Sequence, residues 1–152
     1  IQLIISEHLF QQHFGSKMLS EFYSGVDLTA FSGVPFSLYY ETGAMNVIIR
    51  QHLSDCGISL EKTPYHISDC DTHILLCSSG LCAALIPKML SLRVHEHNAK
   101  CSPGQRIHIF PVKSFHYPLR VELIWHKNIT QPFYVKVFCE LIDEAANQLM
   151  KK

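Results

Sequence analysis

The sequence predicts an α/β fold with a mostly parallel sheet and flanking helices. Short apolar strands alternate with amphipathic helices along nearly all of the 152 residues, and this alternation is typical of a parallel sheet whose strands are connected by helices. Residues 81–86 (LCAALI) are apolar at every position, as expected for a strand that is covered on both faces. A chain of this length can bury a sizeable core without disulfide bonds or metals.

The first half of the chain holds two strands and one clear helix. Residues 1–5 form a short apolar strand, a polar, histidine-containing stretch follows at residues 6–13, and residues 35–40 (PFSLYY) form an aromatic-rich strand. The helix after it carries four apolar residues at the i, i+3, i+4, i+8 spacing of an amphipathic helix, namely Met45, Ile48, Ile49 and Leu53. Gly57 stands where a left-handed cap is expected to end this helix.

The second half continues the alternation. Residues 65–68 form a strand, Asp69 caps the helix that follows, and Gly80 ends that helix. After the apolar strand described above comes a polar loop, and residues 107–112 form the next strand.

The C-terminal part predicts one more strand and one more helix. Residues 120–126 alternate between apolar and polar side chains, as a half-buried strand does. Thr130 caps a final helix with Pro132 in its first turn, where the missing N–H of proline costs nothing. The apolar stripe of this helix consists of Phe138, Leu141, Ile142, Ala145 and Leu149.

The composition argues against several classes of protein. Thirteen basic residues offset thirteen acidic ones, so the chain has little means of binding DNA phosphates by itself. No apolar run approaches the roughly 20 residues of a membrane helix, and residues 1–5 lack the basic region and cleavage site of a signal peptide. We therefore expect a cytoplasmic protein with no membrane partner, whose cysteines are reduced thiols. The cysteines are Cys56, Cys70, Cys77, Cys82, Cys101 and Cys139.

Four stretches, in this order, resemble the effector-binding domain of LysR-type transcriptional regulators. Residues 27–36 resemble the family's DL..L.G.PFI segment, residues 54–58 its L...G..P segment, residues 79–87 its GLGIALLP strand, and residues 123–138 its closing strand and helix. Each motif is short, and the match depends on their common order and spacing. Cys82 departs from the pattern, because the family has the second glycine of GLG at that position.

The resemblance implies a fold similar to type 2 periplasmic binding proteins, in which two lobes are joined by crossover strands and a small effector binds between them. It assigns residues 1–13 and 120–152 to part of the first regulatory lobe and residues 14–119 to the second. The family's DNA-binding winged helix-turn-helix is absent from this chain, so DNA would be contacted only through that missing domain. Family members form homodimers through the effector-binding domain and tetramers overall.

Two turns are the candidate effector site. They cover residues 40–44 and 68–70, where predicted strands lead into helices, and ligands of α/β sheets bind beyond the carboxyl ends of strands. Free N–H groups and the positive end of a helix favour a carboxylate there, and the resemblance implies a hydroxyl contact from Ser68. The alternative is that Thr42 and Asp69 only cap their helices. The candidate effector-binding residues are Tyr40, Thr42, Gly43, Ala44, Ser68 and Asp69.

A metal site is a weaker hypothesis. His95, Glu96 and His97 with Cys101 form the best cluster, because histidines two apart on a strand share one face. Structural zinc sites usually need four ligands in recognisable pairs, and the sequence contains no CxxC or HxxxH pair. We therefore predict no metal.

Redox and catalytic roles find little support in the sequence. Cys70, Cys77 and Cys82 could form a redox sensor, although cysteines within helices and strands are more often small buried apolar residues. A nucleophile elbow, a GxGxxG motif and a phosphate loop are all missing. We therefore predict no catalytic residue, no cofactor and no enzymatic activity.

The sequence thus predicts the effector-binding domain of a LysR-type regulator, which senses a small, anionic metabolite to control DNA-dependent transcription. The alternative is an exported solute-binding receptor of the same fold, which an upstream signal peptide would favour. A metal-binding enzyme that uses cysteine and histidine ligands is the third hypothesis, and metal analysis of chelator-free protein would test it.

Overall fold

The computed structural model describes residues 1–15, 19–115, 117, 118, 122–124, 126, 128, 130 and 132–150. The chain divides into two compact units, Ile1–Tyr117 and Pro118–Lys152, and each is described by itself. Within the described residues no helix is long and apolar enough to cross a membrane.

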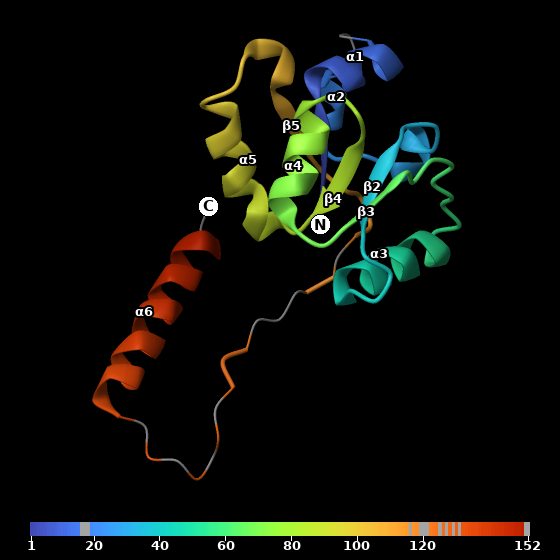
Figure 1. The fold of residues 1–152 in the computed structure, drawn as a ribbon. Helices are drawn as coiled ribbons and strands as arrows, with labels where there is room; N and C mark the ends of the chain where they lie inside the picture. The colour runs from blue at the N-terminus through green and yellow to red at the C-terminus, as the bar shows by residue number, and fades with distance from the viewer. Residues whose placement is uncertain are drawn as a thin grey trace. The chain divides into compact units, whose positions relative to one another are not determined.

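The Ile1–Tyr117 unit is built on a five-stranded sheet with the strand order β3-β2-β4-β1-β5 (Figure 1). The strands are β1 (Gln2–Ser6), β2 (Phe36–Tyr39), β3 (Tyr65–Ile67), β4 (Ala83–Ile86) and β5 (Ile107–Pro111). β2 runs parallel to β3 and to β4, whereas β1 is antiparallel to both β4 and β5. The α/β fold is confirmed, with β1 as the strand that runs against the others of this sheet.

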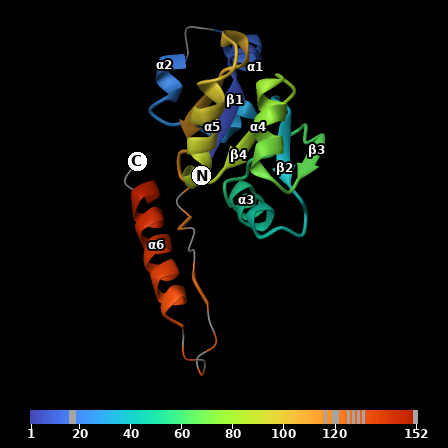
Figure 2. The same cartoon turned by 60° about the vertical axis from the view of Figure 1, so that its left-hand side comes forward.

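Helices cover both faces of the sheet (Figures 1 and 2). The longer helices are α1 (Glu7–Phe14), α3 (Ala44–Asp55), α4 (Cys70–Ser78) and α5 (Ser91–Asn98), and the short ones are α2 (Leu19–Phe22), η2 (Leu28–Phe31), η3 (Lys88–Leu90) and η4 (Pro103–Gln105). α1 and α3 pack on one hydrophobic cluster, and α4 and α5 pack on another. Alternate residues of β4 enter the two clusters, with Leu85 on the α3 side and Ile86 on the α4 side. The predicted burial of this strand on both faces is confirmed.

The helix boundaries follow the signals that the sequence contains. Asp69 caps α4 through its carboxylate, which accepts a hydrogen bond from the Thr72 N–H at 2.8 Å. Gly57 and Gly80 have φ angles of +64° and +72°, so the left-handed turns after α3 and α4 suit glycine.

The N-terminal segment belongs to the Ile1–Tyr117 unit. β1 is hydrogen-bonded between β4 and β5, so residues 1–13 belong to the same compact unit as residues 19–115. The physical reason is burial: Leu3, Ile4 and Ile5 are all fully buried, with Leu3 and Ile5 in the cluster on one face of the sheet and Ile4 in the cluster on the other. The assignment of residues 1–13 and 120–152 to one lobe and of residues 14–119 to another stays a prediction.

The Pro118–Lys152 unit contains the helix α6 (Phe133–Met150). It begins directly after Pro132, whose carbonyl accepts hydrogen bonds from the N–H groups of Val135 and Lys136. The predicted final helix is therefore confirmed, but it begins after Pro132, so Pro132 does not lie in its first turn and Thr130 is not at its cap position. The side chain of Leu149 lies outside the described part. Of the strand predicted at residues 120–126, positions 122–124 and 126 have no regular structure, and the other positions lie outside the described residues.

Candidate functional site

The two predicted effector turns follow the carboxyl ends of neighbouring parallel strands. Tyr39 at the end of β2 is paired with Ile67 at the end of β3, and the Tyr40 N–H donates to the Ile67 carbonyl at 3.2 Å. The turns that contain Thr42 and Ser68 therefore begin at one edge of the sheet. The helices that follow them, α3 and α4, lie on opposite faces of the sheet.

The turn before α3 leaves the start of that helix without a side-chain cap. Gly43 occupies the cap position, and no side chain accepts a hydrogen bond from the first N–H groups. Thr42 is exposed and does not cap the helix, so the capping alternative is wrong for this residue. Uncapped N–H groups at a helix start carry a partial positive charge and need an acceptor. The Gly43 N–H already donates to the Tyr40 carbonyl at 2.9 Å, so the N–H groups open to an anion are those from Ala44 onward.

The turn before α4 differs from the turn before α3, because a side chain caps the helix that follows it. The Asp69 carboxylate caps the helix, and its hydrogen bonds with Thr72 hold the pKa of Asp69 below its ordinary value. Its negative charge at this helix start would repel an anion. Ser68 is exposed, and its hydroxyl has no hydrogen-bond partner within the described part of the chain. For Asp69 the structure supports the capping role.

A buried polar group beneath these turns was missed in the sequence. His73 of α4 is 0% exposed, its Nδ1 lies 2.7 Å from the Ser37 hydroxyl, and its ring lies 4.7 Å from the Tyr39 ring. Burial lowers the pKa of His73 to about 4, so this imidazole is neutral at pH 7. One sequence signal could have indicated part of this group: side chains alternate along β2, so residues 37 and 39 lie on the same face of the sheet.

Two atoms of this group have no hydrogen-bond partner among the described residues. They are the Tyr39 hydroxyl oxygen and His73 Nε2, and both are buried. Burial, reinforced by the nearby Cys70 and Asp69, raises the pKa of Tyr39 above its ordinary value. Both side chains are therefore neutral hydrogen-bonding groups directly behind the start of α4.

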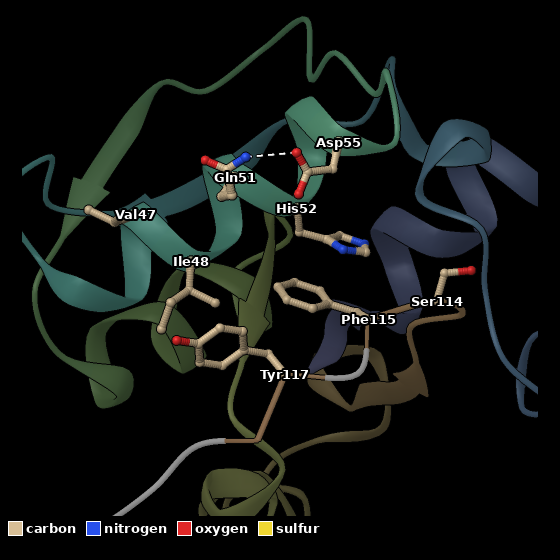
Figure 3. A pocket seen from close by; sticks show the side chains of 8 residues that line it. All are labelled: Val47, Ile48, Gln51, His52, Asp55, Ser114, Phe115 and Tyr117. Atoms are coloured by element: carbon tan, nitrogen blue, oxygen red, sulfur yellow. Dashed lines mark hydrogen bonds between the residues drawn. The ribbon is translucent and has the colours of Figure 1, made fainter.

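A separate pocket lies along the second half of α3 (Figure 3). Its volume is about 320 Å³, and its lining comes from α3 and from the segment that follows β5. The His52 ring stacks on Phe115 with a centroid distance of 3.9 Å and an interplanar angle of 7°, and burial lowers the pKa of His52. Ser114 at the rim has a left-handed φ of +64°. None of the six candidate effector residues lines this pocket.

The geometry on which the metal hypothesis depended is wrong. His95 and His97 lie on the helix α5 and not on a strand, and residues two apart on a helix point roughly 200° apart around its axis. Within the described residues no group of three or more histidine, cysteine or acidic side chains could hold a metal ion.

Comparisons with known proteins find solved structures that are similar to this chain. No protein-family model matches the chain, and no curated protein does. The effector-binding domain of QuiR in complex with shikimate has a TM-score of 0.56 and 14% identity, and the match covers 91% of this chain and 57% of that chain. The effector-binding domain of a BenM variant has a TM-score of 0.50 and 15% identity, with 73% of this chain and 44% of that chain covered. CbnR, a LysR family transcriptional regulator, has a TM-score of 0.48 and 15% identity, with 73% of this chain and 32% of that chain covered.

This chain has the fold of a LysR-family effector-binding domain. The likeness to the QuiR and BenM domains carries this statement, and at such low identity it concerns the fold alone. The chain spans between 32% and 57% of the length of the three solved chains. The LysR-like fold agrees with the motif order in the sequence.

Proposed function

We propose that the Ile1–Tyr117 unit is an effector-binding lobe of a LysR-type transcriptional regulator, and that it senses a small anionic metabolite. The observation that carries the proposal is the shared edge of β2 and β3, where the predicted turns lie next to the uncapped start of α3. Anions bind at such helix starts because the backbone N–H groups point at them.

The two turns would hold different parts of the effector. The N–H groups at the start of α3, from Ala44 onward, would bind the carboxylate, because no side chain competes for them. Ser68 offers an unpartnered hydroxyl, and Tyr40 offers a ring that is 59% exposed. The Asp69 charge keeps the anionic end away from α4.

Regulation would follow from a preference of the effector for one arrangement of the domain. A ligand shifts an equilibrium only when it binds one state more tightly than the other. We propose that this shift is transmitted through dimer or tetramer contacts to a DNA-binding domain outside this chain, in the cytoplasm. The alternative function is an exported solute-binding receptor of the same fold, which an upstream winged helix-turn-helix would exclude.

Replacing Ser68 by leucine is expected to abolish effector binding and to leave the fold intact. Ser68 is exposed and makes no hydrogen bond within the described residues, so its loss removes little from stability, while the larger apolar side chain fills the turn. Titration calorimetry against a panel of small carboxylates, with shikimate among them because QuiR's domain was solved with it, measures the effect.

The matched control for this experiment is Ser59→Leu, because Ser59 is an exposed serine in the loop between α3 and β3. It should bind the same carboxylate as the unmodified chain does. Unaltered binding by Ser68→Leu, or equal losses in both variants, would contradict the proposed site.

Gly43→Asp is expected to weaken anion binding at least tenfold. Aspartate caps helices a few tenths of a kcal/mol better than glycine does, whereas a Cβ at this position would lie 3.2 Å from the Tyr40 carbonyl oxygen and requires that carbonyl to shift by a few tenths of an ångström, so circular dichroism accompanies the binding measurement to check the fold. A carboxylate there would take the N–H groups of α3 and repel the effector.

Gly43→Asn is the matched control, because it caps the same N–H groups without a charge. The loss of binding should be smaller in this variant, and the difference should shrink at high salt. Equal binding by the aspartate variant and the unmodified chain would show that the effector does not use the start of α3.

A further inference from the structure

The pocket along the second half of α3 is separate from the candidate effector turns, because none of the six candidate effector residues lines it. Its volume of about 320 Å³ falls within the range of small-molecule sites, roughly 300–1,000 Å³. A ligand bound in this pocket would therefore not occupy the turns that are proposed for the anionic effector.

Aromatic rings form part of the pocket wall (Figure 3). The His52 ring stacks on Phe115 with a centroid distance of 3.9 Å, and the Tyr117 ring, which is 51% exposed, is open to a ligand. Val47 and Ile48 of α3 add aliphatic side chains to the same lining. The faces of aromatic rings carry partial negative charge, so this wall can attract a cation as well as an apolar group.

Asp55 gives the pocket a negative charge. One of its carboxylate oxygens accepts a hydrogen bond from Gln51 Nε2 at 2.7 Å (Figure 3), and the other has no hydrogen-bond partner among the described residues. The side-chain carbonyl oxygen of Gln51 is likewise left to accept a hydrogen bond. Burial lowers the pKa of His52, so this ring is neutral at pH 7. Of the described residues that line the pocket, Asp55 alone is then charged.

We propose that this pocket binds a small organic cation, namely a protonated primary amine with a short apolar or aromatic body. An ammonium group has three N–H donors, and the Asp55 carboxylate and the Gln51 carbonyl oxygen are acceptors. The body of the ligand would lie against the Tyr117 ring and the aliphatic side chains of α3. The inference does not depend on the proposed effector function.

Other classes of ligand suit the pocket less well. The Asp55 charge repels an anion, and the described lining offers no positive charge to offset it. A bare metal ion lacks ligands, because within the described part of the chain no group of three or more histidine, cysteine or acidic side chains could hold one. A neutral ligand could use the rings and leave the carboxylate without a counter-charge.

An NMR titration of the ¹⁵N-labelled chain with benzylammonium tests the proposal. Benzyl alcohol has nearly the same shape without the charge, and benzoate reverses the charge. We expect benzylammonium to shift the amide signals of Gln51, Asp55 and Ser114, and to bind roughly tenfold more tightly than benzyl alcohol, because an exposed ion pair and a cation–π contact each add a few-fold. Equal binding of the two compounds, or binding of benzoate at these residues, would overturn the proposal.

Asp55→Asn is expected to weaken the binding of benzylammonium roughly fivefold, the upper range for one exposed ion pair. Asparagine can still accept the hydrogen bond from Gln51, and a negative charge at the C-terminal end of a helix is unfavourable, so the variant should fold. The matched control is Glu61→Gln, an exposed acidic residue in the loop between α3 and β3. If both variants bind benzylammonium equally well, the Asp55 carboxylate does not hold the amine and the proposal is wrong.

Two substitutions of Tyr117 test the contribution of its ring. Tyr117→Leu should weaken benzylammonium binding roughly threefold through the lost cation–π contact, whereas Tyr117→Phe keeps the ring and should bind as the unmodified chain does. Equal losses in both variants would contradict a role for the ring. Asp55→Asn should also leave the binding of carboxylates at the start of α3 unchanged, so that failure of the amine site and failure of the effector site are told apart.

Discussion

Phe10→Ala is expected to lower the free energy of unfolding of the Ile1–Tyr117 unit by about 3–5 kcal/mol, the range for removing a buried phenylalanine. Phe10 is 0% exposed, and its ring lies 5.2, 5.5 and 5.6 Å from the rings of Phe14, Phe22 and Phe110. The change leaves a cavity and removes edge and tilted ring contacts. Since small domains are stable by only about 5–15 kcal/mol, urea unfolding followed by circular dichroism will resolve the loss.

Phe133→Ala is the matched control, because this phenylalanine of α6 is 81% exposed. Its substitution should change the unfolding midpoint of the Ile1–Tyr117 unit very little. A loss below about 1 kcal/mol for Phe10→Ala would show that α1 does not pack on the sheet, and the placement of residues 1–13 in this unit would then be wrong.

Acid is expected to destabilise the Ile1–Tyr117 unit between about pH 6.5 and pH 4 through His73. The folded pKa of about 4 lies below the unfolded value of roughly 6.5, so the unfolded chain binds the extra proton in this window. Stability therefore falls as pH falls through the window, by up to roughly 3 kcal/mol, and the effect of His73 levels off below pH 4. Urea unfolding at a series of pH values measures this slope.

His73→Gln is expected to flatten that slope, because glutamine does not titrate and its amide can still hydrogen-bond Ser37. Part of the slope will remain, since burial also lowers the pKa of His52. His95→Gln, at an exposed position of α5, is the matched control and should keep the full slope. An unchanged slope in His73→Gln would mean that His73 is not buried as a neutral imidazole.

The fold was largely predictable because its signals are local. The apolar run of β4, the helical spacing in α3, the Asp69 cap and the left-handed glycine after α4 each follow from a few neighbouring residues. α1 was missed because its sequence looks polar. Only Leu9 and Phe10 of this helix are buried, and Ser6 caps it with a side-chain oxygen that accepts from the Leu9 N–H at 3.2 Å.

The candidate site was predictable only in part. The order of strands and turns locates residues 40–44 and 68–69 at one edge of the sheet, because parallel strands end together. The contacts between distant segments were not predictable. Ser37 and His73 meet only because α4 packs on the face of the sheet toward which Ser37 points, and the pairing of β1 with β4 and β5 decides which unit the N-terminal segment joins.

The position of β1 also determines the order in which the chain can fold during synthesis. Leu3 pairs with Leu85 on one side and with Phe110 on the other, so β1, which is synthesised before the other four strands of this sheet, is among the last to find both neighbours. Pairing over such long sequence distances is slow. Until β5 has emerged, the apolar residues of β1 are exposed, and chaperone binding or aggregation of nascent chains is expected to concentrate on them.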